Sequence, residues 1–329
     1  MEKVRIGCVK YLNTLPLIEG LRSWRDCEVV TAAPSGLIGM LLRGEVDVAL
    51  ASVIDAVGGH GSGEPCHQEP AGGHGSGEPC HQEPPVPVLL PVGMIGCDGP
   101  TLTVRVFSRG PIEKMTRVHV DAESHTSVAL LQVLMWRKYG VRIEVARYEA
   151  GSDGGTERRS DEGGGNAGAS GSDGGRERQS DGGGGNAQAG WPEAVLLIGD
   201  KVVTDAPPAE MYPHQMDLGA AWKGLTGLPF VYAVWMCRGG EEETTRVRAA
   251  AAMLDRARRH NRTRLGWIAE SRADEKHWPE DLAAEYLGRL LKYDVGDAER
   301  EAVEKFTGWA RELGLCGARE ARWCECAAV

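Results

Sequence analysis

Short apolar runs alternate with helical patterns along most of the chain. Ala194–Ile198 is a continuous apolar run with the length and composition of a buried strand, and Val4–Val9 and Val46–Leu50 have the same character. Between such runs lie stretches with apolar residues at helical spacing, such as Pro34–Leu42 and the longer segment from Ser124. This alternation predicts an α/β protein with largely parallel sheets.

Two duplicated segments interrupt the pattern. Residues 58–70 and 72–84 carry the same GGHGSGEPCHQEP sequence, and residues 151–170 are followed by a close copy at 171–190. These segments hold about half of the 45 glycines and almost no large apolar side chain, so they cannot offset the entropy lost on ordering. We expect 58–84 and 151–190 to be disordered insertions in surface loops of a 262-residue core.

Charge and cysteine content narrow the functional class. The formal net charge of −10 argues against a nucleic-acid partner. No apolar stretch is long enough to cross a membrane, and the charged start at residues 1–7 lacks the apolar segment of a secretory signal. We therefore expect a cytoplasmic protein with reduced cysteines. The Cys-His pairs at 66–67 and 80–81 match no standard zinc spacing, so no metal site is expected.

Polar residues follow several predicted strands. Asn13-Thr14 comes after the first strand and begins a predicted helix, either as a simple cap or as an anion site at the helix N-terminus. Ser124-His125-Thr126-Ser127 repeats this geometry with three hydroxyl groups, where one is enough for a cap. Gly199-Asp200 ends a buried strand, and Asp200 either orients a substrate hydroxyl or caps the next segment.

Common catalytic motifs do not explain these residues. The sequence contains no Walker loop, His-Glu-x-x-His or Gly-x-Ser-x-Gly motif. The glycine runs at 163–165 and 182–185 lie inside the second insertion, not between a strand and a helix, so they are not phosphate-binding loops.

Four stretches together resemble a known enzyme family. They are RIG…KYLNTLPL at residues 5–17, GEVDVAL at 44–50, DAESHTSVALL at 121–131, and LIGD at 197–200, which is followed by DLG and WKGLTGLPFV up to residue 231. In this order they resemble chorismate dehydratases of the futalosine route to menaquinone. The resemblance covers essentially the whole core and has no counterpart for the insertions.

The resemblance implies a type II periplasmic-binding-protein fold with a ligand cleft between two α/β lobes. We expect one lobe from residues 1–100 with 210–329 and the other from 101–209. It further implies a hydro-lyase that removes water from chorismate to give 3-[(1-carboxyvinyl)oxy]benzoate, without a metal or organic cofactor. The expected partner is this small molecule, with no nucleic acid and no membrane.

The resemblance also implies site residues. Asn13 falls at the family's catalytic position. The expected substrate-binding residues are Tyr11, Thr14, Ser35, Cys97, Ser124, His125, Thr126, Ser127, Gly199 and Asp200. Cys97 stands where the family often has serine, and His125 where it often has arginine.

Two other functions remain as alternatives. One is a lyase like 1,4-dihydroxy-6-naphthoate synthase of the same pathway, which shares the fold but usually carries a Ser-Pro-Cys-Pro-Asn-type segment where this chain has KYLNT. The other is a binding protein for small anions without enzymatic activity.

Overall fold

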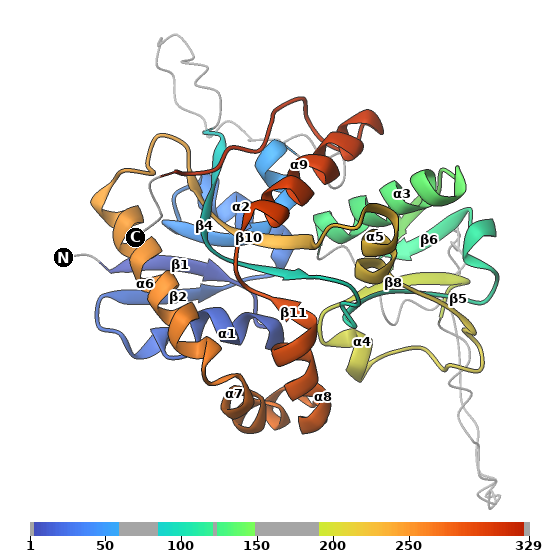
Figure 1. Cartoon of the computed structure of the whole chain (residues 1–329), viewed down its shortest axis with the longest axis horizontal. Helices are drawn as coiled ribbons and strands as arrows, with labels where there is room; N and C mark the ends of the chain where they lie inside the picture. Colours follow the sequence, from blue (N-terminus) through green and yellow to red (C-terminus); the bar gives the residue numbers. More distant parts are fainter. Residues whose placement is uncertain (1–2, 59–84, 121–123, 149–190, 326–329) are drawn as a thin grey trace, which may run out of the picture. The chain divides into compact units, whose positions relative to one another are not determined.

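The computed structural model describes residues 3–58, 85–120, 124–148 and 191–325. Met1–Tyr148 and Glu193–Val329 form one compact unit, which carries two β-sheets (Figure 1). Both duplicated segments predicted to be disordered lie almost entirely outside the described residues.

The first sheet has six strands in the order β11-β4-β10-β3-β1-β2. β1 pairs in parallel with β2 and β3, whereas β10 runs antiparallel to β3 and β4. The strands are β1 (Val4–Cys8), β2 (Cys27–Thr31), β3 (Val48–Ser52), β4 (Pro87–Cys97), β10 (Phe230–Arg238) and β11 (Leu291–Lys292).

Helices cover both faces of this sheet because its strands bury side chains on both sides. In β3, Val48 and Leu50 belong to one core cluster, and Ala49 and Ala51 to the other. One face packs against α1 (Leu15–Ile18), α6 (Thr245–Arg262), α7 (Leu265–Arg272) and α8 (Glu280–Glu285); the other packs against α2 (Pro34–Leu42) and α9 (Asp297–Glu312).

The second sheet has five strands in the order β7-β6-β8-β5-β9. β6 is parallel to β7 and β8, and β5 is antiparallel to β8 and β9. The strands are β5 (Val104–Ser108), β6 (Arg117–Val120), β7 (Glu144–Arg147), β8 (Ala194–Ile198) and β9 (His214–Asp217). The associated helices are α3 (His125–Tyr139), α4 (Lys201–Thr204) and α5 (Leu218–Thr226).

Asp217 joins the two segments that cross between the sheets. Its carboxylate caps α5 by accepting from Ala220 N at 3.0 Å, and it accepts from Thr101 N and Leu102 N on the β4–β5 crossing at 3.0 and 2.7 Å. Leu102 has φ +72°, a conformation that is unfavourable for a residue with a side chain and that these hydrogen bonds help to hold.

Most expected elements are present, with three corrections. The sheets are mixed, not largely parallel, because β10 and β5 run antiparallel to their neighbours. The apolar spacing over residues 281–291 predicts a single helix, but the structure has α8, the π-helical turn η6 (Tyr286–Leu290) and β11 there. The helix expected from Asn13 is a 3₁₀ turn, η1 (Leu12–Thr14), followed by the short α1 with Pro16 in its first turn.

Within the described part of the chain, no helix is both long enough and apolar enough to cross a membrane. The division into lobes stays a prediction. The second sheet includes β9, which lies beyond the expected boundary at residue 209.

Candidate active site

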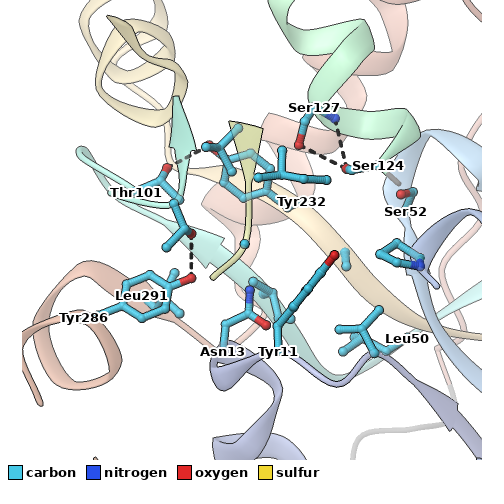
Figure 2. Close-up of a pocket in the computed structure, with 18 residues that line it drawn as sticks. Tyr11, Asn13, Leu50, Ser52, Thr101, Ser124, Ser127, Tyr232, Tyr286 and Leu291 are labelled. Carbon is cyan, nitrogen blue, oxygen red and sulfur yellow. Dashed lines mark hydrogen bonds between the residues drawn. The ribbon is translucent and has the colours of Figure 1, made fainter. Parts of the chain in front are cut away.

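A pocket of about 600 Å³ lies where residues of both sheets meet (Figure 2). The first sheet contributes residues from β3, β4, β10 and β11, and the second contributes Val104 and Ile198 at the ends of β5 and β8. The polar side chains in the lining are those of Tyr11, Asn13, Ser52, Thr101, Thr103, Ser124, Ser127, Tyr232 and Tyr286. The remaining lining residues are glycine, alanine, proline and aliphatic side chains.

Asn13 lies on the turn that follows β1, and its side chain lines the pocket beside Tyr11 (Figure 2). The Thr14 hydroxyl donates to Asn13 Oδ1 at 3.3 Å, and Thr14 itself is fully buried. Neither residue caps a helix with its side chain, so the predicted cap is wrong. The side chain of Asn13 therefore lines the pocket and does not cap a helix.

Tyr286 is the second fixed group around Asn13. Its hydroxyl lies 2.6 Å from Thr103 Oγ1, and its ring stacks on Trp278 with centroids 4.9 Å apart. Burial raises the pKa of Tyr286, while hydrogen bonds from Thr103 and Asn13 oppose that rise. Tyr286 is therefore a neutral hydroxyl at physiological pH.

Asp200 supports this arrangement from outside the lining. Its carboxylate accepts from Leu12 N at 3.4 Å and from Trp278 Nε1 at 3.1 Å. It makes no side-chain cap of α4, which excludes the capping alternative. Burial raises the pKa of Asp200. Asp200 thus positions the turn that carries Asn13 and the indole that stacks on Tyr286.

The start of α3 forms another wall. Ser124 caps α3, because its Oγ accepts from Ser127 N at 3.3 Å, and the two hydroxyl oxygens lie 3.0 Å apart. Both serines line the pocket (Figure 2), whereas the buried Thr126 accepts from Ile54 N at 3.4 Å. Ser124 is therefore both the cap and a lining residue, and Ser127 is the second of the three hydroxyls that line the pocket.

His125 does not line this pocket among the described residues. Its Nδ1 lies 2.7 Å from Oδ1 of Asp55, a buried residue on η3 (Val53–Val57). The hydrogen bond to Asp55 raises the pKa of His125, in opposition to burial. His125 thus ties α3 to η3 and does not reach the ligand space as the sequence predicted.

Cys97 is fully buried behind the lining. Its Sγ lies 3.1 Å from Thr101 Oγ1, which in turn lies 2.7 Å from the Tyr232 hydroxyl. Burial raises the pKa of the Cys97 thiol to about 11, so the thiol is neutral. Thr101 and Tyr232 line the pocket where Cys97 was expected to.

Gly199 has a steric role in the pocket. Its φ of +65° is left-handed, and a β-carbon there would lie 3.2 Å from the ring of Tyr11. This position lets the β8 end approach Tyr11 closely. Ser35 is half-buried in the first turn of α2, next to the lining residue Pro34, but is not itself part of the lining.

Sequence reasoning missed Tyr286, Tyr232, Thr101 and Thr103. Tyr286 lies in the stretch 281–291, whose spacing indicates an ordinary amphipathic helix, and Thr101 and Thr103 lie within residues 101–107, whose composition indicates a strand. The only available signal for Tyr232 was its place beside the family-like LTGLPFV segment at 225–231.

No ordinary acid or base lines this pocket among the residues that the structure describes. Its 18 described lining residues include no His, Asp, Glu, Lys, Arg or Cys, and burial raises the pKa values of Tyr232 and Tyr286 above their normal range. The pocket therefore offers hydroxyls, one amide and apolar surface. Such a site can orient a ligand and donate hydrogen bonds, but lacks a side chain with a pKa near neutrality.

Comparison with known proteins identifies the family of this chain. A family model described as menaquinone biosynthesis matches residues 4–58, 86–162 and 184–312. The chain belongs to this menaquinone biosynthesis family. The gaps in the match, residues 59–85 and 163–183, fall almost entirely within the two duplicated segments.

A relative and three solved structures extend this assignment. A chorismate dehydratase from Thermus thermophilus is 28% identical over 329 residues, with 96% of this chain and 97% of that protein covered. Among solved structures, an Archaeoglobus fulgidus protein matches with a TM-score of 0.55, 13% identity and coverage of 95% of this chain and 98% of that one.

The other two structures carry the fold name. The aliphatic sulphonate-binding protein SsuA of Escherichia coli matches with a TM-score of 0.54 at 14% identity, covering 96% and 89% of the two chains. A Candida albicans protein described as having the generic periplasmic-binding-protein fold matches with a TM-score of 0.58 at 8% identity, covering 97% and 92%. The menaquinone-family chain thus has the periplasmic-binding-protein fold.

Proposed function

We propose that this protein is a chorismate dehydratase of menaquinone biosynthesis, a carbon–oxygen lyase that forms 3-[(1-carboxyvinyl)oxy]benzoate. Support comes from the family match over most of the chain and from the Thermus thermophilus relative.

The main observation behind the proposed mechanism is that the described lining contains no ordinary base. Loss of the C3 proton and the C4 hydroxyl makes the ring of chorismate aromatic, so the reaction is intrinsically downhill. A carboxylate of the substrate itself can accept the C3 proton. The protein then has to hold the substrate in the reactive geometry and donate hydrogen bonds to the leaving hydroxide.

Asn13 and Tyr286 are suited to that task. The Asn13 amide reaches the pocket beside the Tyr286 hydroxyl, and neither group is charged. We assign Asn13 to orienting the reacting groups and Tyr286 to donating toward the departing oxygen. Ser124 and Ser127, at the N-terminal turn of the 15-residue α3, are placed to bind a substrate carboxylate.

The remaining expected residues support the site indirectly. Thr14, Thr126, His125, Cys97 and Asp200 hold neighbouring segments in place, as their hydrogen bonds suggest. We further propose a cytoplasmic location, and two lobes that correspond to the two sheets.

Incubation of purified protein with chorismate tests the proposal. The expected product has lost one water and is identified by mass spectrometry. If chorismate is not converted but still raises the melting temperature of the protein, the protein binds this anion without acting on it. That result would contradict the proposed dehydratase activity.

A further inference from the structure

A second pocket, of about 540 Å³, lies among the helices of the first sheet. Part of its lining is apolar and consists of Pro16, Leu265, Leu287, Gly288 and Leu291. The rest is charged or polar and consists of Arg258, Arg262, Lys292, Asp294 and Tyr293. Three cationic side chains thus meet a single carboxylate, whereas the first pocket has no lysine or arginine in its described lining.

The cations differ in how they are engaged. Arg258 is largely buried, and it binds Asp255 at 2.7 Å, the Val92 carbonyl at 3.1 Å and also Asp294. Arg262 is 70% exposed and pairs with Asp294 at 3.2 Å. Lys292 is exposed and forms no ion pair within the described ranges. The pocket therefore presents a positively charged rim that its own carboxylate does not neutralise.

Tyr293 adds an unusual polar group. Its side chain is about nine-tenths buried, and the hydroxyl finds no hydrogen-bond partner among the described residues. Buried hydroxyl groups without a partner are rare in native structures, because the lost hydration is not replaced. A bound ligand with an acceptor atom would satisfy this donor.

Two chain segments contribute to both pockets. In the segment after β1, Asn13 lines the first pocket, and Pro16, one helical turn later, lines the second pocket. In the second segment, around residues 286–291, Tyr286 lines the first pocket and Leu287 and Gly288 line the second pocket. Leu291 lines both pockets. This second segment contains the π-helical turn η6, a distortion often found at functional sites.

We propose that the second pocket binds a small amphipathic carboxylate, with its apolar body against Leu265 and Leu287 and its carboxylate near Lys292 and Arg262, and that occupancy changes the placement of Asn13 and Tyr286. Binding at the second pocket does not depend on the proposed function; an effect on chorismate turnover does. The coupling exists because a ligand that fixes Pro16 and Leu287 restricts the same short segments that carry Asn13 and Tyr286.

Benzoate is the probe, with benzyl alcohol as its neutral analogue and inorganic phosphate as an anion without an apolar body. Isothermal titration compares wild type with Lys292→Glu, which reverses charge at an exposed site. Lys114→Glu is the matched control, because Lys114 is also exposed but lies on η4 (Ile112–Lys114) near the second sheet. Asn13→Asp tests binding in the first pocket.

Benzoate is expected to bind wild type more tightly than benzyl alcohol or phosphate. Lys292→Glu should weaken benzoate binding about tenfold or more, Tyr293→Phe should weaken it by a smaller factor, and Lys114→Glu and Asn13→Asp should leave it within about twofold. No binding to wild type, or a loss caused by Asn13→Asp and not by Lys292→Glu, would overturn the proposal.

Amide hydrogen exchange measures the coupling without any turnover. Saturating benzoate should slow exchange in residues 11–18 and 286–292 of wild type, and this effect should vanish in Lys292→Glu at the same concentration. Benzoate binding with unchanged exchange in these segments would overturn the coupling. If chorismate is not converted but the binding and exchange results hold, the proposed function fails and the second site stands.

Discussion

His125 on α3 and Asp55 on η3 form a contact between two segments that are 70 residues apart in the sequence, with Nδ1 and Oδ1 at 2.7 Å. Next to it, Ile54 N donates to Thr126 Oγ1 at 3.4 Å. Both contacts join the turn that follows β3 of the first sheet to the helix that follows β6 of the second. The start of α3, which carries Ser124 and Ser127, is thereby tied to the first sheet.

Replacement of His125 by glutamine should remove a contribution to stability that depends on pH in a defined direction. The pKa of His125 is raised in the folded protein, because the charged imidazolium is stabilised there by Asp55. This contribution to the unfolding free energy is fully present below the unfolded-state pKa of histidine, and it is lost as the pH rises through the folded-state pKa. We expect His125→Gln to lower the unfolding free energy by about 2 kcal/mol at pH 6, because the neutral glutamine amide does not supply the positive charge of the imidazolium beside Asp55, and by less at pH 9.

Urea unfolding of both proteins at pH 6 and pH 9 measures this difference. His260→Gln is a matched control, since His260 lies near the end of α6 and makes an exposed hydrogen bond to Arg264. A loss of stability in His125→Gln that is equal at both pH values would contradict an ionic role for the pair.

Gly199→Ala should destabilise the protein and narrow the first pocket. Alanine at φ +65° is strained, and its β-carbon would lie 3.2 Å from the Tyr11 ring, so we expect a loss of about 1–2 kcal/mol. Displacement of Tyr11 should also raise KM for chorismate.

Gly36→Ala provides the control for this change. Gly36 lies within α2 with open space around its would-be β-carbon, and alanine favours helix over glycine. Denaturation of the two variants side by side checks the prediction. Equal stability of Gly199→Ala and wild type, with an unchanged KM, would show that the strand end and Tyr11 adapt freely.

The sequence predicts the α/β class and most of the elements, because hydrophobic spacing determines which segments can be buried. The family resemblance implies Asn13, Ser124 and Gly199 as site residues, and their positions at strand ends or helix starts agree with that expectation. The sequence does not predict the antiparallel placement of β10, since strand direction follows from chain crossings that local spacing does not encode.

The missed part of the site has a similar cause. Tyr286 reaches the pocket only because α8 gives way to the turn η6 and then to β11, which pairs with β4. Asp200 becomes a support for Asn13 through contacts with Leu12 and Trp278, which are 188 and 78 positions away in the chain. Such long-range contacts depend on the tertiary fold and not on local pattern.

Cys97→Ser should be tolerated. The Cys97 thiol is neutral, its pKa being raised to about 11 by burial, and its polar contact is with Thr101 Oγ1. A serine hydroxyl can make the same contact and is a stronger hydrogen-bond partner. We expect turnover within about threefold of wild type and a melting temperature within a few degrees, measured by chorismate assay and thermal unfolding.

Cys97→Val is the control for this change, because valine cannot donate a hydrogen bond to Thr101. It should lose more activity than Cys97→Ser; the opposite order would show that only packing matters at this position.

The two duplicated segments should be dispensable. Their sequences hold almost no large apolar side chain, so they have little to contribute to a packed core. Replacement of 58–84 and of 151–190 by short Gly-Ser linkers should leave the melting temperature within a few degrees and turnover within about twofold. Thermal unfolding and the chorismate assay on each deletion test this. A drop of many degrees, or a loss of turnover, would mean that a segment packs against the core or acts in the site.

Asn13→Asp tests the residue on which the proposed chemistry depends most. Asn13 makes no helix cap, so its replacement should leave the melting temperature within a few degrees of wild type. The new carboxylate would stand in a pocket whose described lining carries no cation, beside a substrate with two carboxylates, and it could no longer donate a hydrogen bond toward Tyr286. We expect turnover of chorismate to fall by at least ~100-fold, about 2.7 kcal/mol of transition-state stabilisation.

Asn13→Ala separates the two causes of that loss, because it removes the amide without adding charge. A decrease in kcat for both variants is expected if the amide orients the reacting groups. If Asn13→Ala keeps more than about a tenth of wild-type kcat while Asn13→Asp does not, repulsion of the substrate explains the loss and the amide is not needed for the chemistry. In that case one of the hydroxyls in the described lining, such as that of Tyr286, Ser124 or Ser127, has to donate to the leaving oxygen.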